Sequence, residues 1–135
     1  MRIPAPSVVR GVAVNLECPS VDEWLREVKN SPESPGIGMY LVHNGVVRGH
    51  SRTGDAVSAL ELEVDRRALD EAVSRALEHE GVIAVRVWVN EGHLGVGDDI
   101  MLVLVAGDIR DNVFPALQGL VGELKTRVVK EREIA

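Results

Sequence analysis

The chain has 135 residues, of which 45% are apolar and 27% are charged, and its formal net charge is −6. This length predicts one globular domain over residues 1–135, which buries roughly two thirds of its unfolded surface without a disulfide or a metal. The acidic balance disfavours non-specific binding to nucleic acids or anionic membranes, and an aromatic content of 3% disfavours base stacking. Composition therefore excludes several classes of protein and selects no function.

Cys18 is the single cysteine of the chain, so no disulfide can form within it and an oxidising compartment is not indicated. We expect Cys18 to be a small buried hydrophobic residue, and the alternative, a nucleophilic thiol, would need a nearby base or helix N-terminus. The N-terminal residues lack the continuous apolar segment of a signal peptide. The longest apolar run, at residues 100–106, is too short to span a membrane. These observations predict a cytoplasmic protein.

Strands predominate in the first half of the chain. Residues 8–16 are rich in β-branched side chains, which predict a strand. Ser20 and Glu23 form a capping box that opens a helix, and this helix ends near Asn30. From Leu60 onward, apolar and polar side chains alternate as in a half-exposed strand. The other segments of this half are, in chain order, a loop at 31–36, a strand at 38–47 that bends near Asn44 and Gly45, a mobile loop at 49–55, and the half-exposed strand at 56–64.

A second helix follows Asp65, which is placed to cap it. Its apolar residues recur at helical spacing, and the expected buried stripe consists of Leu69, Ala72, Val73, Ala76 and Leu77. Gly81 lies where a C-cap glycine belongs. Residues 82–89 and 100–106 predict strands, the latter central because it is apolar on both faces. The glycines of residues 92–98 predict a tight turn between them.

Asn112 is placed to cap the last helix, which puts Pro115 in its first turn. Its expected buried stripe consists of Val113, Leu117, Leu120, Val121 and Leu124. Val128 and Val129 open either a final strand or a tail. The order of elements predicts an α+β domain with a mostly antiparallel sheet and helices packed on one side.

Familiar catalytic motifs are missing from the sequence. His43, His50, His79 and His93 are scattered and form neither an HExxH motif nor a cluster with the cysteine, so we expect no metal site. His79 lies between two glutamates at a helix end and is expected to be a solvated cap residue. No dinucleotide-binding motif, phosphate loop or nucleophile elbow occurs, and we expect no bound cofactor.

Three basic residues stand out by their positions. Arg48 follows a strand at a glycine-containing loop, Arg110 precedes a helix, and Lys125 lies at the end of that helix. Cations at the ends of strands and helices can line a site for phosphate or carboxylate, because their hydrogen bonds to such anions are charge-assisted. The alternative is that each is a solvated surface charge, as most lysines and arginines are.

Several segments carry motifs in a definite order and spacing. Residues 38–50 (GMYLVHNGVVRGH) end in G-x-V-R-x-H, residues 59–63 (ALELE) form the next strand, and residues 92–98 (GHLGVGD) read G-x-L-x-x-G-D. Residues 100–114 and the pair Leu124–Lys125 with the two residues after it complete the set. Together these segments resemble the large, catalytic subunit of molybdopterin synthase over roughly residues 36–133.

The resemblance implies an α/β-hammerhead-like fold and a homodimer within a heterotetramer. Each large subunit would accept the C-terminal tail of a small ubiquitin-like sulfur-carrier subunit, and this tail carries a thiocarboxylate. The family transfers that sulfur to cyclic pyranopterin monophosphate, which gives the dithiolene of molybdopterin during molybdenum cofactor biosynthesis. Because the sulfur arrives on the partner, Cys18 needs no role as a relay.

The resemblance also implies roles for individual residues. Lys125 corresponds to the catalytic lysine, which either stabilises the carbonyl or intermediate by its charge or reacts through its amine. Arg48 and Arg110 correspond to cations that line the substrate site. The family has a second lysine in a W-K-K-E segment, where this chain reads VVKERE. Lys130 takes its place if two residues are deleted, and Arg132 takes it without a gap.

Other departures leave two further functions open. Val46 and Ile109 stand where the family has an arginine and a histidine. One alternative is a diverged, non-catalytic relative that acts as a dimeric binding module for the small subunit or an anion. The other is a dimeric domain with an unrelated small anionic ligand. The catalytic hypothesis predicts that Arg48 and Lys125 approach each other, with Arg110 of either subunit facing the same pocket.

Overall fold

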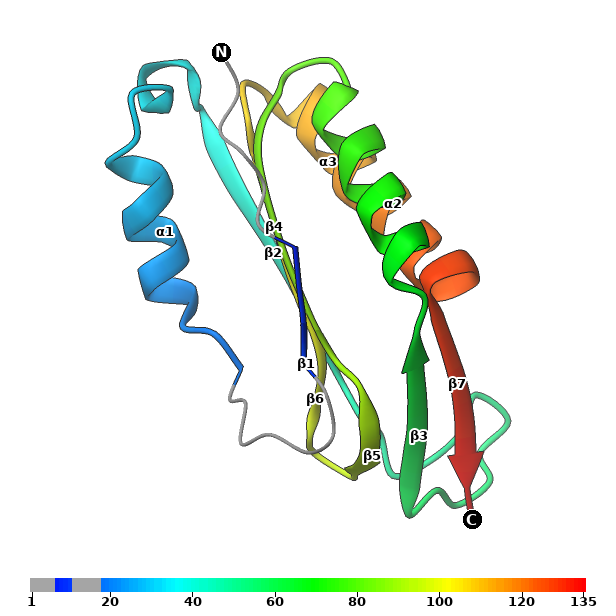
Figure 1. Cartoon of the computed structure of the whole chain (residues 1–135). Coiled ribbons are helices and arrows are strands. Elements are labelled where there is room, and N and C mark those ends of the chain that lie inside the picture. Colours follow the sequence, from blue (N-terminus) through cyan, green and yellow to red (C-terminus); the bar gives the residue numbers. More distant parts are fainter. Residues whose placement is uncertain (1–6, 11–17) are drawn as a thin grey trace.

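The computed structural model describes residues 7–10 and 18–135, which form two sheets and three helices. The larger sheet contains, in spatial order, β1 (Ser7–Arg10), β4 (Val82–Asn90), β6 (Asp99–Gly107) and β2 (Met39–Val46). The smaller sheet contains β5 (Gly92–Gly95), β3 (Ala59–Val64) and β7 (Val129–Ile134), and it extends from one end of the larger one (Figure 1). Only β1 and β4 pair in parallel among these strands, so the predicted α+β class with mostly antiparallel sheets is confirmed.

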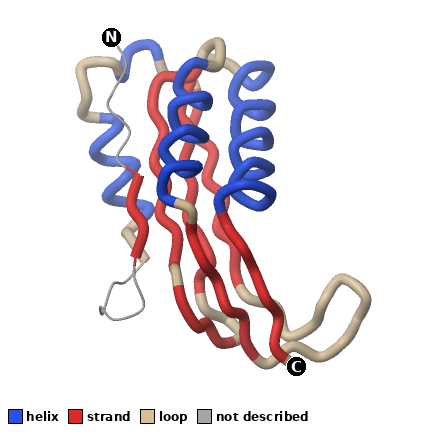
Figure 2. The backbone as a smooth tube through the Cα atoms, turned by 45° about the vertical axis from the view of Figure 1, so that its right-hand side comes forward, coloured by secondary structure: helices blue, strands red, loops and turns tan. Residues whose placement is uncertain are grey.

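The helices cover both faces of the larger sheet (Figures 1 and 2). On one face lies α1 (Val21–Lys29), whose Trp24 packs with Trp88 and Leu104. On the other face lie α2 (Arg66–Glu78) and α3 (Arg110–Glu123), over Val85 and Val103. The expectation that all helices pack on one side holds only for α2 and α3. Because β6 is apolar on both faces, each face needs a covering layer, and α1 supplies the second one.

The predicted caps of the first two helices are confirmed. Ser20 Oγ accepts a hydrogen bond from the Glu23 backbone N–H at 3.3 Å. The Asp65 carboxylate accepts one from the Ala68 N–H at 3.0 Å. At the C-terminus of α2 the cap residue is His79, the cap residue expected at that helix end, whereas the C-cap position predicted for Gly81 was wrong: Gly81 lies two residues later, in a turn with φ +80.

The third helix begins earlier than predicted, at Arg110 instead of after Asn112. Asp108 Oδ1 accepts hydrogen bonds from the Ile109 N–H at 2.6 Å and from Asn112 Nδ2 at 2.9 Å, so Asn112 donates to the residue that organises the first turn. Pro115 consequently lies inside the helix, beyond the first turn. The predicted cap at Asn112 was therefore wrong.

The structure differs from the prediction in the bounds of two strands and in one turn, part of which forms a strand. The strand predicted at residues 8–16 overlaps β1, and its residues 11–16 lie outside the described residues. The strand predicted at 56–64 begins at Ala59. Within the turn predicted at 92–98, the first four residues form β5, which pairs with β3. A strand can form there because β3 offers an edge, which the local glycine content does not reveal.

The chain ends as a strand, which resolves the alternative at Val128 and Val129. A five-residue π-helical turn, Leu124–Val128, follows α3, and β7 then pairs antiparallel with β3 from Val129 onward. This pairing brings the C-terminal residues beside the loop that joins β2 to β3 (Figures 1 and 2). None of the helices in the described part of the chain combines the length and apolar character that a membrane crossing requires.

Candidate functional site

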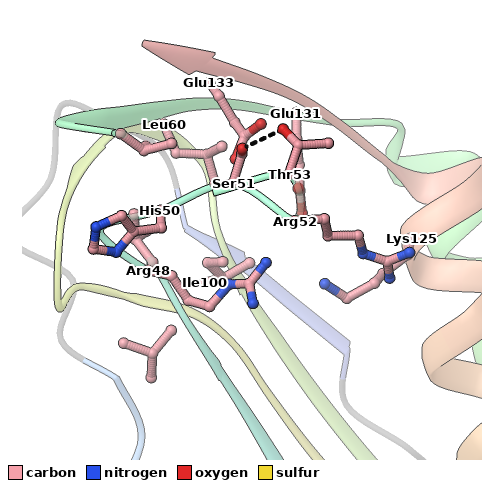
Figure 3. A pocket seen from close by; sticks show the side chains of 13 residues that line it. Arg48, His50, Ser51, Arg52, Thr53, Leu60, Ile100, Lys125, Glu131 and Glu133 are labelled. Atoms are coloured by element: carbon pink, nitrogen blue, oxygen red, sulfur yellow. Dashed lines mark hydrogen bonds between the residues drawn. The ribbon is translucent and has the colours of Figure 1, made fainter. Parts of the chain in front are cut away.

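A cavity of about 450 Å³ lies where the end of β2, the loop at residues 48–58, the smaller sheet and the π-helical turn meet (Figure 3). Its walls come from the middle of the chain and from its C-terminal part, because β7 pairs with β3 and the loop precedes β3. The charged and titratable residues that line it are Arg48, His50, Arg52, Lys125, Glu131 and Glu133. Arg48 and Lys125, which the sequence placed in one site, therefore share this cavity.

Arg48 is carried into the cavity by the end of β2. The pairing of β2 with β6 changes register between the last two residues of β2, which agrees with the predicted bend. The next residue, Val47, is buried, and its backbone N–H donates to the Asp98 carbonyl at 3.0 Å. The Val47 carbonyl accepts from the Gly97 N–H at 2.9 Å. The exposed Arg48 side chain thus projects from backbone that the core holds in place.

Lys125 is the second residue of the π-helical turn. Leu124 and Val128 at the two ends of this turn are buried, whereas Lys125 is exposed and projects toward the cavity (Figure 3). The Thr126 hydroxyl donates to the Gly122 carbonyl at 2.9 Å, which joins the turn to α3. A widened turn of this kind redirects side chains relative to a regular α-helix and frequently occurs at functional sites.

His43 on β2 lies close enough to Lys125 to sense its charge. Burial and then the positive charge of Lys125 lower the pKa of the His43 imidazole from its ordinary value of 6.5. Among the described residues, its buried Nε2 atom has no hydrogen-bond partner. The neutral ring is therefore the favoured form near Lys125.

Of the two faces of β7, one carries side chains that line the cavity and the other does not. Glu131 and Glu133 line the cavity, whereas Lys130 and Arg132 alternate with them along the strand and lie outside its lining. Arg132 Nη2 forms an ion pair with Glu61 Oε1 at 3.6 Å, directly across the pairing of β7 with β3. Neither of the residues proposed for the second family lysine thus shares the cavity of Lys125.

Arg110 lies at the opposite end of α3 from Lys125, and the helix between them is about 20 Å long. It lines a different hollow, together with Gly38, Asp108 and Phe114. Within one chain, the structure therefore brings Arg48 and Lys125 together and leaves Arg110 apart.

The cavity combines three cations with two carboxylates. Among the described residues, none of Arg48, Arg52 and Lys125 forms an ion pair with an acidic side chain. In Figure 3 the charged ends of these three residues point toward one another. Such an arrangement can bind an anion through charge-assisted hydrogen bonds, and the lysine amine can stabilise a developing negative charge or act as a nucleophile.

Sequence reasoning did not single out Arg52, Glu131 or Glu133 as parts of the site. Arg52 lies in a loop that was predicted only to be mobile, and the two glutamates lie in a segment whose strand was an open alternative. A strand at residues 129–134 would have placed every second side chain on one face, and this alternation was the available signal.

Cys18 packs against the core beneath α1, but it is only partly buried, so the expected full burial was wrong. Burial, with the charge and a hydrogen bond of Asp99, raises the pKa of its thiol to about 11. A protonated thiol is a poor nucleophile. Among the described residues, no group of three or more His, Cys, Asp or Glu side chains is arranged to hold a metal ion.

Comparison with known proteins identifies relatives of the chain. A family model described as MoaE protein matches residues 16–127. The molybdopterin synthase catalytic subunit of Salmonella typhimurium is 36% identical over 94 residues, which are 67% of this chain and 62% of that protein. The chain therefore matches less than two thirds of the length of this curated relative.

Solved structures share the fold. Molybdopterin synthase from Staphylococcus aureus aligns with a TM-score of 0.68 at 22% identity, over 95% of this chain and 88% of that chain. A protein–protein complex of subunits 1 and 2 of molybdopterin-converting factor from Helicobacter pylori aligns with a TM-score of 0.63 at 14% identity, over 96% of this chain and 83% of that chain. At these identities the similarity establishes the fold alone.

Proposed function

The chain belongs to the MoaE protein family, and on this basis we propose that it is the large subunit of a molybdopterin synthase. In this role it transfers sulfur from the C-terminal thiocarboxylate of a small ubiquitin-like subunit to cyclic pyranopterin monophosphate. In each transfer the bond between the partner's acyl carbon and its sulfur breaks, the sulfur bonds to the pterin, and water supplies the oxygen with which the partner leaves as a carboxylate. The lone cysteine is in keeping with a reaction in the cytoplasm.

The observation that carries the proposal is the shared cavity of Arg48 and Lys125. A cyclic phosphate is an anion, and a guanidinium binds phosphate through paired N–H groups. In our proposal, Arg48 holds the phosphate. Lys125 is the catalytic residue, which either stabilises the negative charge that develops at the carbonyl or reacts through its amine.

We further propose that a second copy of the chain supplies Arg110 to this cavity. Arg110 lies too far from Lys125 to serve the same site within one chain. Near it, Ile109 and Phe114 are apolar side chains exposed by 55% and 53%. Leu117, farther along α3, is partly buried. Ile109 and Phe114 lie beside the start of β2, an edge strand of the larger sheet. Exposed apolar residues at such a place are typical of a surface that pairs with another subunit.

The small subunit is the proposed sulfur donor, because the solved Helicobacter pylori relative is a complex of two subunits. Reconstitution tests the function directly. The protein is mixed with a thiocarboxylated small subunit and cyclic pyranopterin monophosphate without oxygen, and dithiolene formation is measured. We expect product to form. Absence of product while the small subunit still binds would contradict the proposal and favour a non-catalytic binding module.

Mixed dimers test the origin of Arg110. We expect Arg110→Ala and Lys125→Ala to be inactive alone, and a mixture of the two to regain activity, because one of its two cavities then has both residues. A mixture that stays inactive after subunit exchange has been shown, for example by mass spectrometry, contradicts a site shared between copies.

A further inference from the structure

Arg52 occupies the tip of the loop between β2 and β3, where its side chain reaches the cavity. In the view of Figure 3 its guanidinium lies beside the Lys125 side chain, and the Lys125 amine lies between the guanidinium groups of Arg52 and Arg48. Arg48, Arg52 and Lys125 all line the same cavity. Two segments of the chain, the loop between β2 and β3 and the π-helical turn, therefore bring three cations to one cavity.

Hydrogen bonds within the loop hold the backbone around Arg52. The Ser51 N–H donates to the Asp55 carbonyl at 2.8 Å, and the Asp55 N–H donates to Ser51 Oγ at 3.1 Å. The Thr53 hydroxyl donates to Asp55 Oδ2 at 3.1 Å. Gly54 completes the turn with φ +92, a conformation that favours glycine. Arg52 is thus presented by a braced turn, so binding an anion orders little more than its own side chain.

The charges in this cavity are not neutralised pairwise. Glu131 and Glu133 share the cavity, and within the described part of the chain neither forms an ion pair with any of its three cations. Like charges that converge repel one another, and an anion bound among them relieves that repulsion. The arrangement therefore favours an anionic ligand between Arg52 and Lys125.

We infer that Arg52 is a further substrate-binding cation of this cavity. It lies beside Lys125 and binds the phosphate of the substrate together with Arg48. This inference rests on the proposed function. It assigns to the β2–β3 loop the role that the family resemblance implied for Lys130 or Arg132. Those two side chains leave β7 on the other side from Glu131 and Glu133, and Arg132 is already paired with Glu61.

The chemistry predicts how substitutions rank. A guanidinium can give two parallel hydrogen bonds to one phosphate, an ammonium keeps the charge without that geometry, and an amide loses the charge. We therefore expect affinity for the phosphate to fall in the order wild type, Arg52→Lys, Arg52→Gln. Because Arg52 is exposed, we expect none of these changes to alter thermal unfolding.

The test is calorimetric titration of the wild-type protein and its variants with cyclic pyranopterin monophosphate in the absence of oxygen. We expect Arg52→Gln to weaken binding at least about tenfold and Arg52→Lys to weaken it less. Arg67→Gln is the matched control, because it removes one positive charge from α2, where the side chain is 93% exposed. We expect this control to bind as the wild type does.

Two results overturn the inference. One is binding by Arg52→Gln within about twofold of the wild type. The other is a larger loss of binding in Lys130→Gln or Arg132→Gln than in Arg52→Gln. Either result leaves the proposed function standing if the wild type still binds the cyclic pterin and forms dithiolene. A wild-type protein that does not bind the cyclic pterin contradicts the proposed function itself, and the role of Arg52 falls with it.

Discussion

The ion pair between Arg75 and Glu123 ties α2 to the end of α3 from which Lys125 follows. Arg75 Nε donates to Glu123 Oε1 at 3.0 Å, and its Nη2 donates to Oε2 at 2.6 Å. The Arg75 and Glu123 side chains are 44% and 28% exposed, so solvent screens the pair. We therefore expect a coupling free energy of about 1 kcal/mol, at the upper end for surface pairs because the geometry is bidentate.

The pair also predicts a pH dependence. Hydrogen bonds from Arg75 are the main cause that lowers the pKa of Glu123 below its ordinary value of 4.5. A lowered carboxyl pKa contributes stability that is present above the ordinary value and is lost as the pH falls through the folded-state pKa. The coupling should therefore be complete near pH 7 and reduced near pH 3.

A double-mutant cycle in urea measures this coupling. The free energy of unfolding is determined for the wild type, Arg75→Gln, Glu123→Gln and the double variant at both pH values. The matched control is the cycle for Arg67 and Glu71, which are one helical turn apart at 3.5 Å and highly exposed, with an expected coupling of about 0.3 kcal/mol. The reasoning is refuted if the two cycles give the same coupling near pH 7, or if that of Arg75 and Glu123 does not decrease near pH 3.

Three further predictions concern single groups. Because the pKa of the Cys18 thiol is about 11, only about 0.1% of the thiol is ionised near pH 8. Iodoacetamide should therefore label it far more slowly in the folded than in the unfolded protein, and equal rates would contradict this. The His43 imidazole should titrate below pH 6.5 in NMR spectra, and Lys125→Gln should raise its pKa, so an unchanged value would show that the two groups are not neighbours. Below that pH, stability that depends on the neutral His43 ring should decrease. Gly81→Ala should destabilise the protein by at least about 1 kcal/mol, because φ is +80 there and an added Cβ meets Asp108 and Asn112; thermal unfolding equal to that of the wild type would refute this.

Local signals in the sequence predicted most elements of the fold. Ser20 and Asp65 cap helices because each side chain meets an N–H a few residues away, and such contacts need no distant partner. The β6 segment was recognised as central because it is apolar on both faces, and its Leu102 and Val103 are buried on opposite sides. The missed strand β5 depends on pairing with β3, which no local pattern reveals.

Some residues of the candidate site could likewise be recognised from the sequence, and others could not. Arg48 and Lys125 were singled out by their positions at the ends of a strand and a helix, the resemblance implied their roles, and the structure places both in one cavity. Arg52 was missed because its approach to Lys125 depends on how the loop folds back over the smaller sheet. Glu131 and Lys130 point to opposite faces because they are consecutive residues of the strand β7. From the sequence, this strand was only one of two alternatives for the C-terminal residues. Non-local packing thus decides which charges meet.

The central claim is that the cavity of Arg48 and Lys125 transfers sulfur to the cyclic pterin. A single-turnover assay of dithiolene formation tests it most directly, with the wild type, Lys125→Ala, and Arg127→Ala as a matched loss of charge from the same turn. We predict product from the wild type and Arg127→Ala, and none from Lys125→Ala, which should unfold at the wild-type temperature because its side chain is exposed. Product formation by Lys125→Ala at the wild-type rate would contradict the claim.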